Sequence, residues 1–321
     1  MKKRHILLAA AALSLTSVSF AQSGGKPVRI VTSFSAGGPV DFVARALADQ
    51  LGRELKRPVI VDNKPGANGA LGAMEALRSE PDGSTLWITS VGAAAINPSL
   101  VDKLPYNTLR DFAPVSLVAN NVEVLVVSAK DPAKDAAEFV KTAKAQKEST
   151  PMASSGSGSI PHLALIQLEE SSGAKFLHVP YKGMAPALTD LMGGQVKGAF
   201  ADVAAIMPHV QGGRLKAIGI AAHKRHPALP DVKTFEEQGI KAVDTNNWYA
   251  FFVSAKTPAP VVQQLNKAVR DTIANPNVSA RLLQGGAEPK SSTPQELAAL
   301  LKADTDKWAA LIKSRNIKAD Q

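Results

Sequence analysis

Runs of β-branched and apolar residues alternate along the chain with stretches in which apolar positions recur at helical spacing. In the first such pair, residues 28–34 predict a buried strand and the apolar positions from Val40 to Leu55 predict a helix. Residues 35–39, Ser-Ala-Gly-Gly-Pro, form a small-residue loop between them. Such a loop exposes backbone N–H groups at the positive end of a helix dipole, so it is either a tight turn or an anion site.

This strand–loop–helix unit recurs along the chain, which predicts an α/β protein with a mostly parallel sheet and helices on both faces. Further strands are expected at 58–62, 84–90, 122–128, 152–154, 176–179, 196–201, 215–222 and 248–254. Helices are expected at 68–77, 136–147, 161–170 and 260–274. Three more are expected: one that ends at 193–194, one that follows residue 202, and one that begins with a capping box at 293–296.

Residues 1–21 have the three parts of a secretory signal peptide: a basic start, a short apolar stretch, and a Ser19-Phe20-Ala21 cleavage site. We therefore expect an exported mature chain that begins at Gln22. Because residue 22 is not cysteine, lipid anchoring through a cysteine is excluded. No later stretch is long and apolar enough to predict a membrane helix.

Composition narrows the class of protein further. The remaining 300 residues suffice for two domains, and loss of Lys2, Lys3 and Arg4 lowers the formal charge from +9 to +6. That mildly basic balance favours anionic ligands but is not a nucleic-acid signature, because no basic run is interleaved with aromatic residues. The chain has no cysteine, so it has no disulfide, thiol nucleophile or zinc–thiolate site.

Motifs of catalysis, cofactor binding and metal binding are missing. Ser155 stands where a nucleophile elbow around Ser157 needs glycine, and Pro161 stands where a dinucleotide loop needs its third glycine. His223 and His226 are expected at the surface and His178 in the core, which predicts no metal site. His162 beside the serine loop has two open roles, ligand contact or a structural hydrogen bond.

Two acidic residues adjoin the predicted loops. Asp41 lies in the first turn of its helix, where it either caps the helix or faces a ligand. Asp202 ends a strand at the carboxyl edge of the sheet, which is where open α/β sheets bind ligands. We favour a binding role over a structural one for Asp202.

The order of the motifs resembles that of the tripartite tricarboxylate transporter substrate-binding proteins, the TctC-like or Bug family. The most specific motif is His178-Val179-Pro180-Tyr181-Lys182-Gly183. The resemblance covers essentially the whole mature chain. The matching segments are residues 34–41, 63–69, 96–100, 154–162, 178–183, 185–196 and 227–232.

The resemblance implies a periplasmic binding protein-like fold of type II. In such a fold, two α/β lobes are joined by a two-strand hinge, and the ligand lies in the cleft between them. We expect lobe 1 to comprise residues 22–121 plus 248–321 and lobe 2 to comprise residues 122–247. Closure around a ligand would then require both lobes to contact it.

The resemblance also implies a periplasmic solute-binding protein, not an enzyme, which acts as a monomer without cofactor, metal or nucleic acid. Its expected partners are a small carboxylate (a di- or tricarboxylate, an acidic amino acid or an aromatic acid) and the membrane subunits of a tripartite transporter. A ligand-binding component of a signalling system and a periplasmic enzyme on this fold are the alternatives. Phe34, Tyr181 and Trp248 are candidates to flank an aromatic acid.

The expected ligand-binding residues come from the loops of both lobes, with backbone amides and short hydroxyls holding the carboxylate. They are Phe34, Ser35, Gly37, Gly38, Asp41, Ser90, Gly92, Ser155, Gly156, Ser159, His162, Tyr181, Lys182, Gly183 and Asp202.

Overall fold

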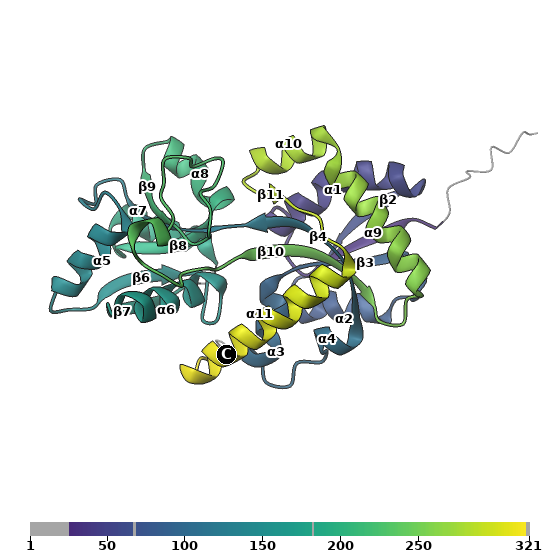
Figure 1. The fold of residues 1–321 in the computed structure, drawn as a ribbon, viewed down its shortest axis with the longest axis horizontal. Helices are drawn as coiled ribbons and strands as arrows, with labels where there is room; N and C mark the ends of the chain where they lie inside the picture. The colour runs from purple at the N-terminus through teal and green to yellow at the C-terminus, as the bar shows by residue number, and fades with distance from the viewer. Residues whose placement is uncertain (1–25, 67–68, 182, 319–321) are drawn as a thin grey trace, which may run out of the picture.

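The computed structural model describes residues 26–66, 69–181 and 183–318, and it shows two α/β lobes side by side (Figure 1). Each lobe is built on one sheet with helices packed against it. The prediction of two α/β lobes is therefore confirmed. The predicted signal peptide and Lys182 lie outside the described residues.

The first lobe contains a six-stranded sheet. Its strands are β1 (Val28–Thr32), β2 (Val59–Asn63), β3 (Thr85–Ser90), β4 (Phe112–Asn121), β10 (Asn247–Ser254) and β11 (Glu288–Pro289), in the order β11-β4-β10-β3-β1-β2. The helices of this lobe are α1 (Pro39–Leu55), α2 (Ala70–Arg78), α3 (Asn97–Leu100), α4 (Thr108–Asp111), α9 (Ala259–Ala274), α10 (Pro276–Gln284) and α11 (Pro294–Ser314). A π-helical turn, η2 (Gly92–Ile96), leads into α3.

The second lobe contains a five-stranded sheet. Its strands are β5 (Glu123–Ser128), β6 (Thr150–Ser154), β7 (Phe176–Pro180), β8 (Gly198–Asp202) and β9 (Leu215–Ile220), in the order β7-β6-β8-β5-β9. Its helices are α5 (Ala136–Ala145), α6 (Ile160–Ser172), α7 (Met184–Gly193) and α8 (Val203–Gln211), together with a 3-10 turn, η3 (Glu236–Gln238).

Both sheets are mixed, so the prediction of a mostly parallel sheet was wrong. In the first lobe β1 pairs in parallel with β2 and β3, whereas β10 pairs antiparallel with β3 and β4. In the second lobe β6 pairs in parallel with β7 and β8, whereas β5 pairs antiparallel with β8 and β9. The cause is the path between the lobes: β4 leaves the first sheet while β10 returns to it, so the two run in opposite directions.

Two adjacent strand segments carry the chain between the lobes (Figure 1). β4 ends at Asn121 and β5 begins at Glu123, with only Val122 between them. β10 begins at Asn247, opposite Asn121 in the antiparallel register. This arrangement matches the predicted two-strand hinge, and it places Glu123 and Asn247 at the crossing point.

The lobes also contact each other directly through α11, which extends from the first lobe beside the second (Figure 1). Ile160, Leu163 and Ile166 of α6 belong to the same hydrophobic cluster as Trp308 and Ile312 of α11. Near the end of that helix the Arg315 guanidinium forms an exposed 2.9 Å ion pair with the Glu170 carboxylate. Burial of the apolar side chains, more than the exposed ion pair, stabilises this arrangement of the lobes.

The elements that were not predicted from the sequence include the long strand β4 and the helix α10. β4 contains Pro114, Ser116 and two asparagines, so it lacks the apolar run that predicts a buried strand, although most of it is buried. α10 begins after Asn275, whose side-chain oxygen accepts hydrogen bonds from the amides of Asn277 and Val278. The Asn-Pro pair at 275–276 is a recognisable helix start that could have predicted α10.

The histidine pair near residue 225 needs a correction. His223 is exposed as expected, but His226 is only 2 % exposed and its Nδ1 accepts a 3.1 Å hydrogen bond from the Ala228 amide.

The described residues contain no cluster of side chains that could hold a metal ion. Over the same ranges, no helix has the length and apolar character that crossing a membrane requires.

Candidate functional site

A cavity of about 480 Å³ lies between the lobes and is lined by residues of both. Several predicted binding residues line it. They are Phe34, Ser90, Gly92, Ser155, Gly156, Ser159, Tyr181, Gly183 and Asp202. Sequence reasoning missed other lining residues. These include Asn97, Leu100, Glu123, Met184 and Asn247.

Four helical segments begin at the wall of this cavity, and each is the next element in the chain after a strand. The η2 turn begins at Gly92 after β3, α6 begins after the N-cap Ser159, α7 after Gly183, and α8 after Asp202. Their N-terminal ends carry partial positive charge and N–H donors without helical partners. The described lining residues include no lysine, arginine or histidine, so among these residues the positive potential comes from the helix ends.

The serine loop that precedes α6 is held in place by its own polar groups. The Gly156 amide donates to Ser154 Oγ at 3.1 Å, and the Ser159 hydroxyl donates to the Gly156 carbonyl at 2.6 Å. No atom in the described part of the chain accepts a hydrogen bond from the amides of Ser155 and Ile160. Those two N–H groups are therefore the donors that this loop offers to an anion.

His162 secures the same loop from the side. Its Nδ1 accepts a 2.9 Å hydrogen bond from the Gly158 amide, and its ring stacks on His178 with centroids 3.7 Å apart. His178 Nε2 lies 2.6 Å from Ser154 Oγ. His162 is not among the lining residues, so the structure favours its structural role over ligand contact. The expectation that His178 lies in the core was wrong, because this residue is half-buried on the edge strand β7.

The loop after β1 differs from the expected anion site. Asp41 is only 2 % exposed, and its carboxylate accepts hydrogen bonds from the Gly37 amide, the Arg45 guanidinium and the Asn63 amide, each at 2.9 Å. The Gly37 amide, which was predicted to hold a ligand, thus donates to Asp41, and the Gly38 amide donates to the Ser35 carbonyl at 3.3 Å. Four binding residues predicted in this segment do not line the cavity: Ser35, Gly37, Gly38 and Asp41.

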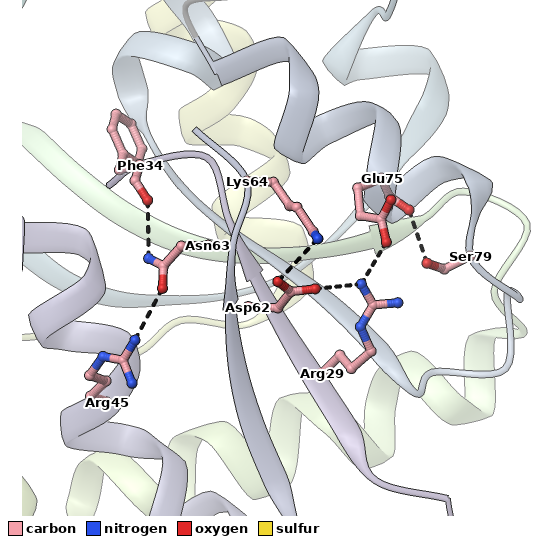
Figure 2. Close-up of polar contacts among 8 residues, drawn as sticks. All are labelled: Arg29, Phe34, Arg45, Asp62, Asn63, Lys64, Glu75 and Ser79. Carbon is pink, nitrogen blue, oxygen red and sulfur yellow. Dashed lines mark hydrogen bonds and ion pairs between the residues drawn. The ribbon is translucent and has the colours of Figure 1, made fainter. Parts of the chain in front are cut away.

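This network instead positions Phe34, which does line the cavity. Figure 2 shows Asn63 between the two elements that it joins: its amide nitrogen donates to the Phe34 carbonyl at 3.0 Å, and its oxygen accepts from Arg45 at 3.0 Å. Beside it, Arg29 bridges the carboxylates of Asp62 and Glu75 at 2.7 and 2.6 Å (Figure 2). These contacts fix the ends of β1 and β2 against α1 and α2.

We expect Asp41→Asn to destabilise the protein by about 1.5–3 kcal/mol at neutral pH, because the replaced carboxylate accepts charge-assisted hydrogen bonds. Burial alone raises the pKa of Asp41, but the bonds from Arg45, Gly37 and Asn63 outweigh it and set the pKa below its ordinary value of 3.8. The stabilisation is therefore present above pH 3.8 and is lost as the pH falls through the lower, folded-state pKa.

Urea unfolding over this acid range measures the effect, and Asp49→Asn, at an exposed position of the same helix, is the matched control. The difference between wild type and Asp41→Asn should shrink below pH 3.8. An unfolding free energy equal to that of wild type at neutral pH would contradict this role.

Tyr181 faces the cavity with its hydroxyl already engaged. That hydroxyl donates to the Asp190 carboxylate at 2.7 Å, and this bond raises the pKa of Tyr181 to about 12. The side chain is therefore neutral and oriented at physiological pH. Trp248 does not belong to the site, because it is fully buried and its indole N–H donates to Asp304 at 2.6 Å.

A pair of acidic side chains lies where the hinge meets the cavity. Glu123 stands directly opposite Asp202 in the antiparallel pairing of β5 with β8, and both line the cavity. Burial, together with the charge of Asp202, raises the pKa of Glu123 well above its ordinary value, and burial also raises that of Asp202. The sequence signal for Glu123 was a charged residue inside the apolar run 122–128.

Sequence comparisons relate the chain to a protein family and to individual relatives. The family model described as "Tripartite tricarboxylate transporter family receptor" (TctC) matches residues 43–317. A "UPF0065 protein in tcbD-tcbE intergenic region" of Pseudomonas sp. (strain P51) is 32% identical, with 99% of this chain and 96% of that protein covered. "Protein BugT" of Bordetella pertussis is 30% identical, with 91% and 90% covered.

Solved structures of similar proteins have the same fold as this chain. The "Structure of a periplasmic transporter" has a TM-score of 0.81 at 37% identity and covers 92% of this chain and 99% of its own. "MatC (Rpa3494) from Rhodopseudomonas palustris with bound malate" has a TM-score of 0.76 at 31% identity, with 89% and 100% covered. "R. palustris Rpa4515 with adipate" has a TM-score of 0.80 at 28% identity, with 90% and 98% covered.

Proposed function

We propose a ligand for this chain, which belongs to the TctC family of tripartite tricarboxylate transporter receptors and is a periplasmic solute-binding protein, not an enzyme. The proposed ligand is a small organic acid whose carboxylate lies against the helix N-termini of the interlobe cavity. The observation that carries the proposal is the convergence of four helical N-terminal ends on one cavity whose described lining has no basic side chain.

The relatives support this ligand class. One solved structure of the family has malate bound and another has adipate, and both ligands carry two carboxylates. In this chain the amides of Ser155 and Ile160 are donors for one such group, and Ser90 and Gly92 lie on the wall formed by the other lobe. A ligand that contacts both walls favours the arrangement in which the lobes enclose it.

The proposal assigns residues 22–121 plus 248–321 to lobe 1 and residues 122–247 to lobe 2. The strand composition of the two sheets supports these boundaries to within one residue, since β10 begins at Asn247. The protein is proposed to act as a monomer after export and cleavage behind Ala21. It would deliver its ligand to the membrane subunits of a tripartite transporter.

A ligand panel tests the proposal. Malate, succinate and adipate should raise the melting temperature, because a ligand that binds only the folded state stabilises it, whereas succinamide, the neutral analogue of succinate, should not. Ser155→Ala removes the hydroxyl but keeps the backbone amide, so it should weaken carboxylate binding by no more than about 1–3 kcal/mol, the cost of one lost buried hydrogen bond. Ser171→Ala, at an exposed site on α6, is the matched control.

Isothermal titration gives the affinities. Failure of every carboxylate to bind, or equal stabilisation by succinamide, would contradict the proposed ligand class.

A further inference from the structure

The serine loop of the second lobe lies against a stacked pair of histidine rings. His162 is in the first turn of α6 and His178 is on β7, and the two rings are 4° from parallel with centroids 3.7 Å apart. Neither residue lines the cavity between the lobes. Any influence of the pair on a ligand must therefore pass through the loop, which does line it.

Each ring holds one backbone amide of the loop. His162 Nδ1 accepts a hydrogen bond directly from the Gly158 amide at 2.9 Å. His178 Nε2 lies 2.6 Å from Ser154 Oγ, and that oxygen accepts a hydrogen bond from the Gly156 amide at 3.1 Å. The two held amides belong to the same short stretch as the N–H groups that are offered to a carboxylate, so the stacked rings determine where those donors point.

The bond to Gly158 determines the protonation state of His162. A ring nitrogen that accepts a hydrogen bond carries no proton, so the ring is neutral and its hydrogen is on Nε2. A proton added to Nδ1 would place two N–H groups against each other, and the Gly158 amide, which belongs to a buried residue, would lose its acceptor. The loop cannot keep this geometry around a charged ring.

The surroundings of His162 allow solvent to screen a charge on its ring. The residue is half-buried and lines a separate surface cavity of about 350 Å³. The charged residues of the described chain that line this cavity are Glu169, Arg315 and Lys318. The titratable group that faces the ring from β7 is His178. Water and the Glu169 carboxylate limit the attraction of a charged ring for an anionic ligand, so the loss of the hydrogen bond to the loop determines the effect.

We propose that His162, held in place by His178, is a positioning residue for carboxylate binding and makes the affinity depend on pH. This inference rests on the proposed carboxylate-binding function and adds its regulation. A neutral ring keeps the amide donors of the serine loop ordered before the ligand arrives, which lowers the cost of binding. As the pH falls through the range in which histidine ordinarily titrates, about pH 6.5, a proton from solvent adds to Nδ1 and the bond to Gly158 breaks. Affinity is therefore present above this range and is lost below it.

Two substitutions of His162 separate the acceptor from the ring. His162→Asn places a side-chain oxygen near the position of Nδ1, so it keeps an acceptor for the Gly158 amide but does not take up a proton in this pH range. His162→Phe keeps a flat ring against His178 but has no acceptor. His223→Asn, at an exposed position of the same lobe, is the matched control.

Isothermal titration with malate, succinate and adipate at about pH 8 and about pH 5 tests the inference. At the higher pH, His162→Phe should bind at least about fivefold more weakly than wild type, because a buried N–H group is left without an acceptor, whereas His162→Asn should stay within about threefold. The ratio of wild-type affinity to His162→Asn affinity cancels the titration of the ligand itself. This ratio should fall at least about fivefold between the two pH values. The corresponding ratio for His223→Asn should not change.

The outcomes separate this inference from the proposed function. If no carboxylate binds to the wild-type protein at either pH, the proposed function fails and the inference fails with it. If carboxylates bind but the ratio of wild type to His162→Asn is the same at both pH values, the inference is wrong while the proposed function stands. That comparison decides the matter even if His162→Phe does not fold. A folded His162→Phe protein with wild-type affinity would also overturn the inference.

Discussion

Replacement of Gly158 by alanine is expected to lower ligand affinity about 5- to 150-fold, the equivalent of about 1–3 kcal/mol of overpacking. Gly158 belongs to the serine loop of the second lobe, and Leu100 of the first lobe faces it across the cavity. A Cβ atom at Gly158 would lie 2.3 Å from Leu100 Cδ2, far inside van der Waals contact. The added methyl group should therefore hold the lobes apart and separate the two walls of the site.

Two further variants isolate this steric effect. Gly158 has a φ of +74°, so alanine also strains the backbone there. Gly173, at the exposed end of α6 with a φ of +69°, has only Lys144 Nζ near its Cβ position, so Gly173→Ala measures strain without the clash. Combining Gly158→Ala with Leu100→Ala should restore much of the lost affinity. Equal losses in the single and double variants would show that contact between the lobes is not the cause.

Trp87→Ala is expected to cost about 3–5 kcal/mol of stability, because it removes a large aromatic side chain from a packed core. Trp87 is fully buried in β3 and packs against Phe112 with ring centroids 4.4 Å apart. Its indole N–H donates to Ser33 Oγ at 2.8 Å, and the Ser33 hydroxyl in turn donates to the Gly69 carbonyl at 2.8 Å. The substitution therefore leaves a cavity and breaks the chain of hydrogen bonds behind the Phe34 loop.

Urea unfolding of Trp87→Ala and Trp87→Phe separates the two contributions. Phenylalanine keeps an aromatic ring but lacks the N–H group, so its cost should be smaller and mainly that of the lost hydrogen bond. A cost below about 1 kcal/mol for alanine would contradict the central position of Trp87 in this core.

Local patterns in the sequence were sufficient to place most helices and strands of both lobes. Residues 39–55 and 294–314 form helices because apolar spacing, an early proline and, for the second, a capping box all agree. β4 was not predicted because its sequence contains proline, serine and asparagine, whereas it is buried by the strands that pair with it. The antiparallel pairings were missed for a related reason, since strand direction depends on the route of the chain between lobes.

The site was predictable where its donors belong to the backbone. The serine loop and Gly183 stand at helix starts that local sequence identifies. The role of Asp41 in α1 was not determined, because its partner Asn63 lies at the end of β2, which is distant in sequence. Glu123 was overlooked for the same reason: it acquires significance only from Asp202, which is distant in sequence but opposite in the sheet.

The central claim is that a carboxylate lies between the lobes on helix N-termini, and a crystal structure with a ligand from the panel tests it most directly. We expect carboxylate oxygens within hydrogen-bond distance of the Ser155 and Ile160 amides, with the same ligand touching the Ser90–Gly92 wall of the other lobe. A ligand bound outside this cavity, or one whose carboxylates contact only side chains of lysine or arginine, would contradict the claim.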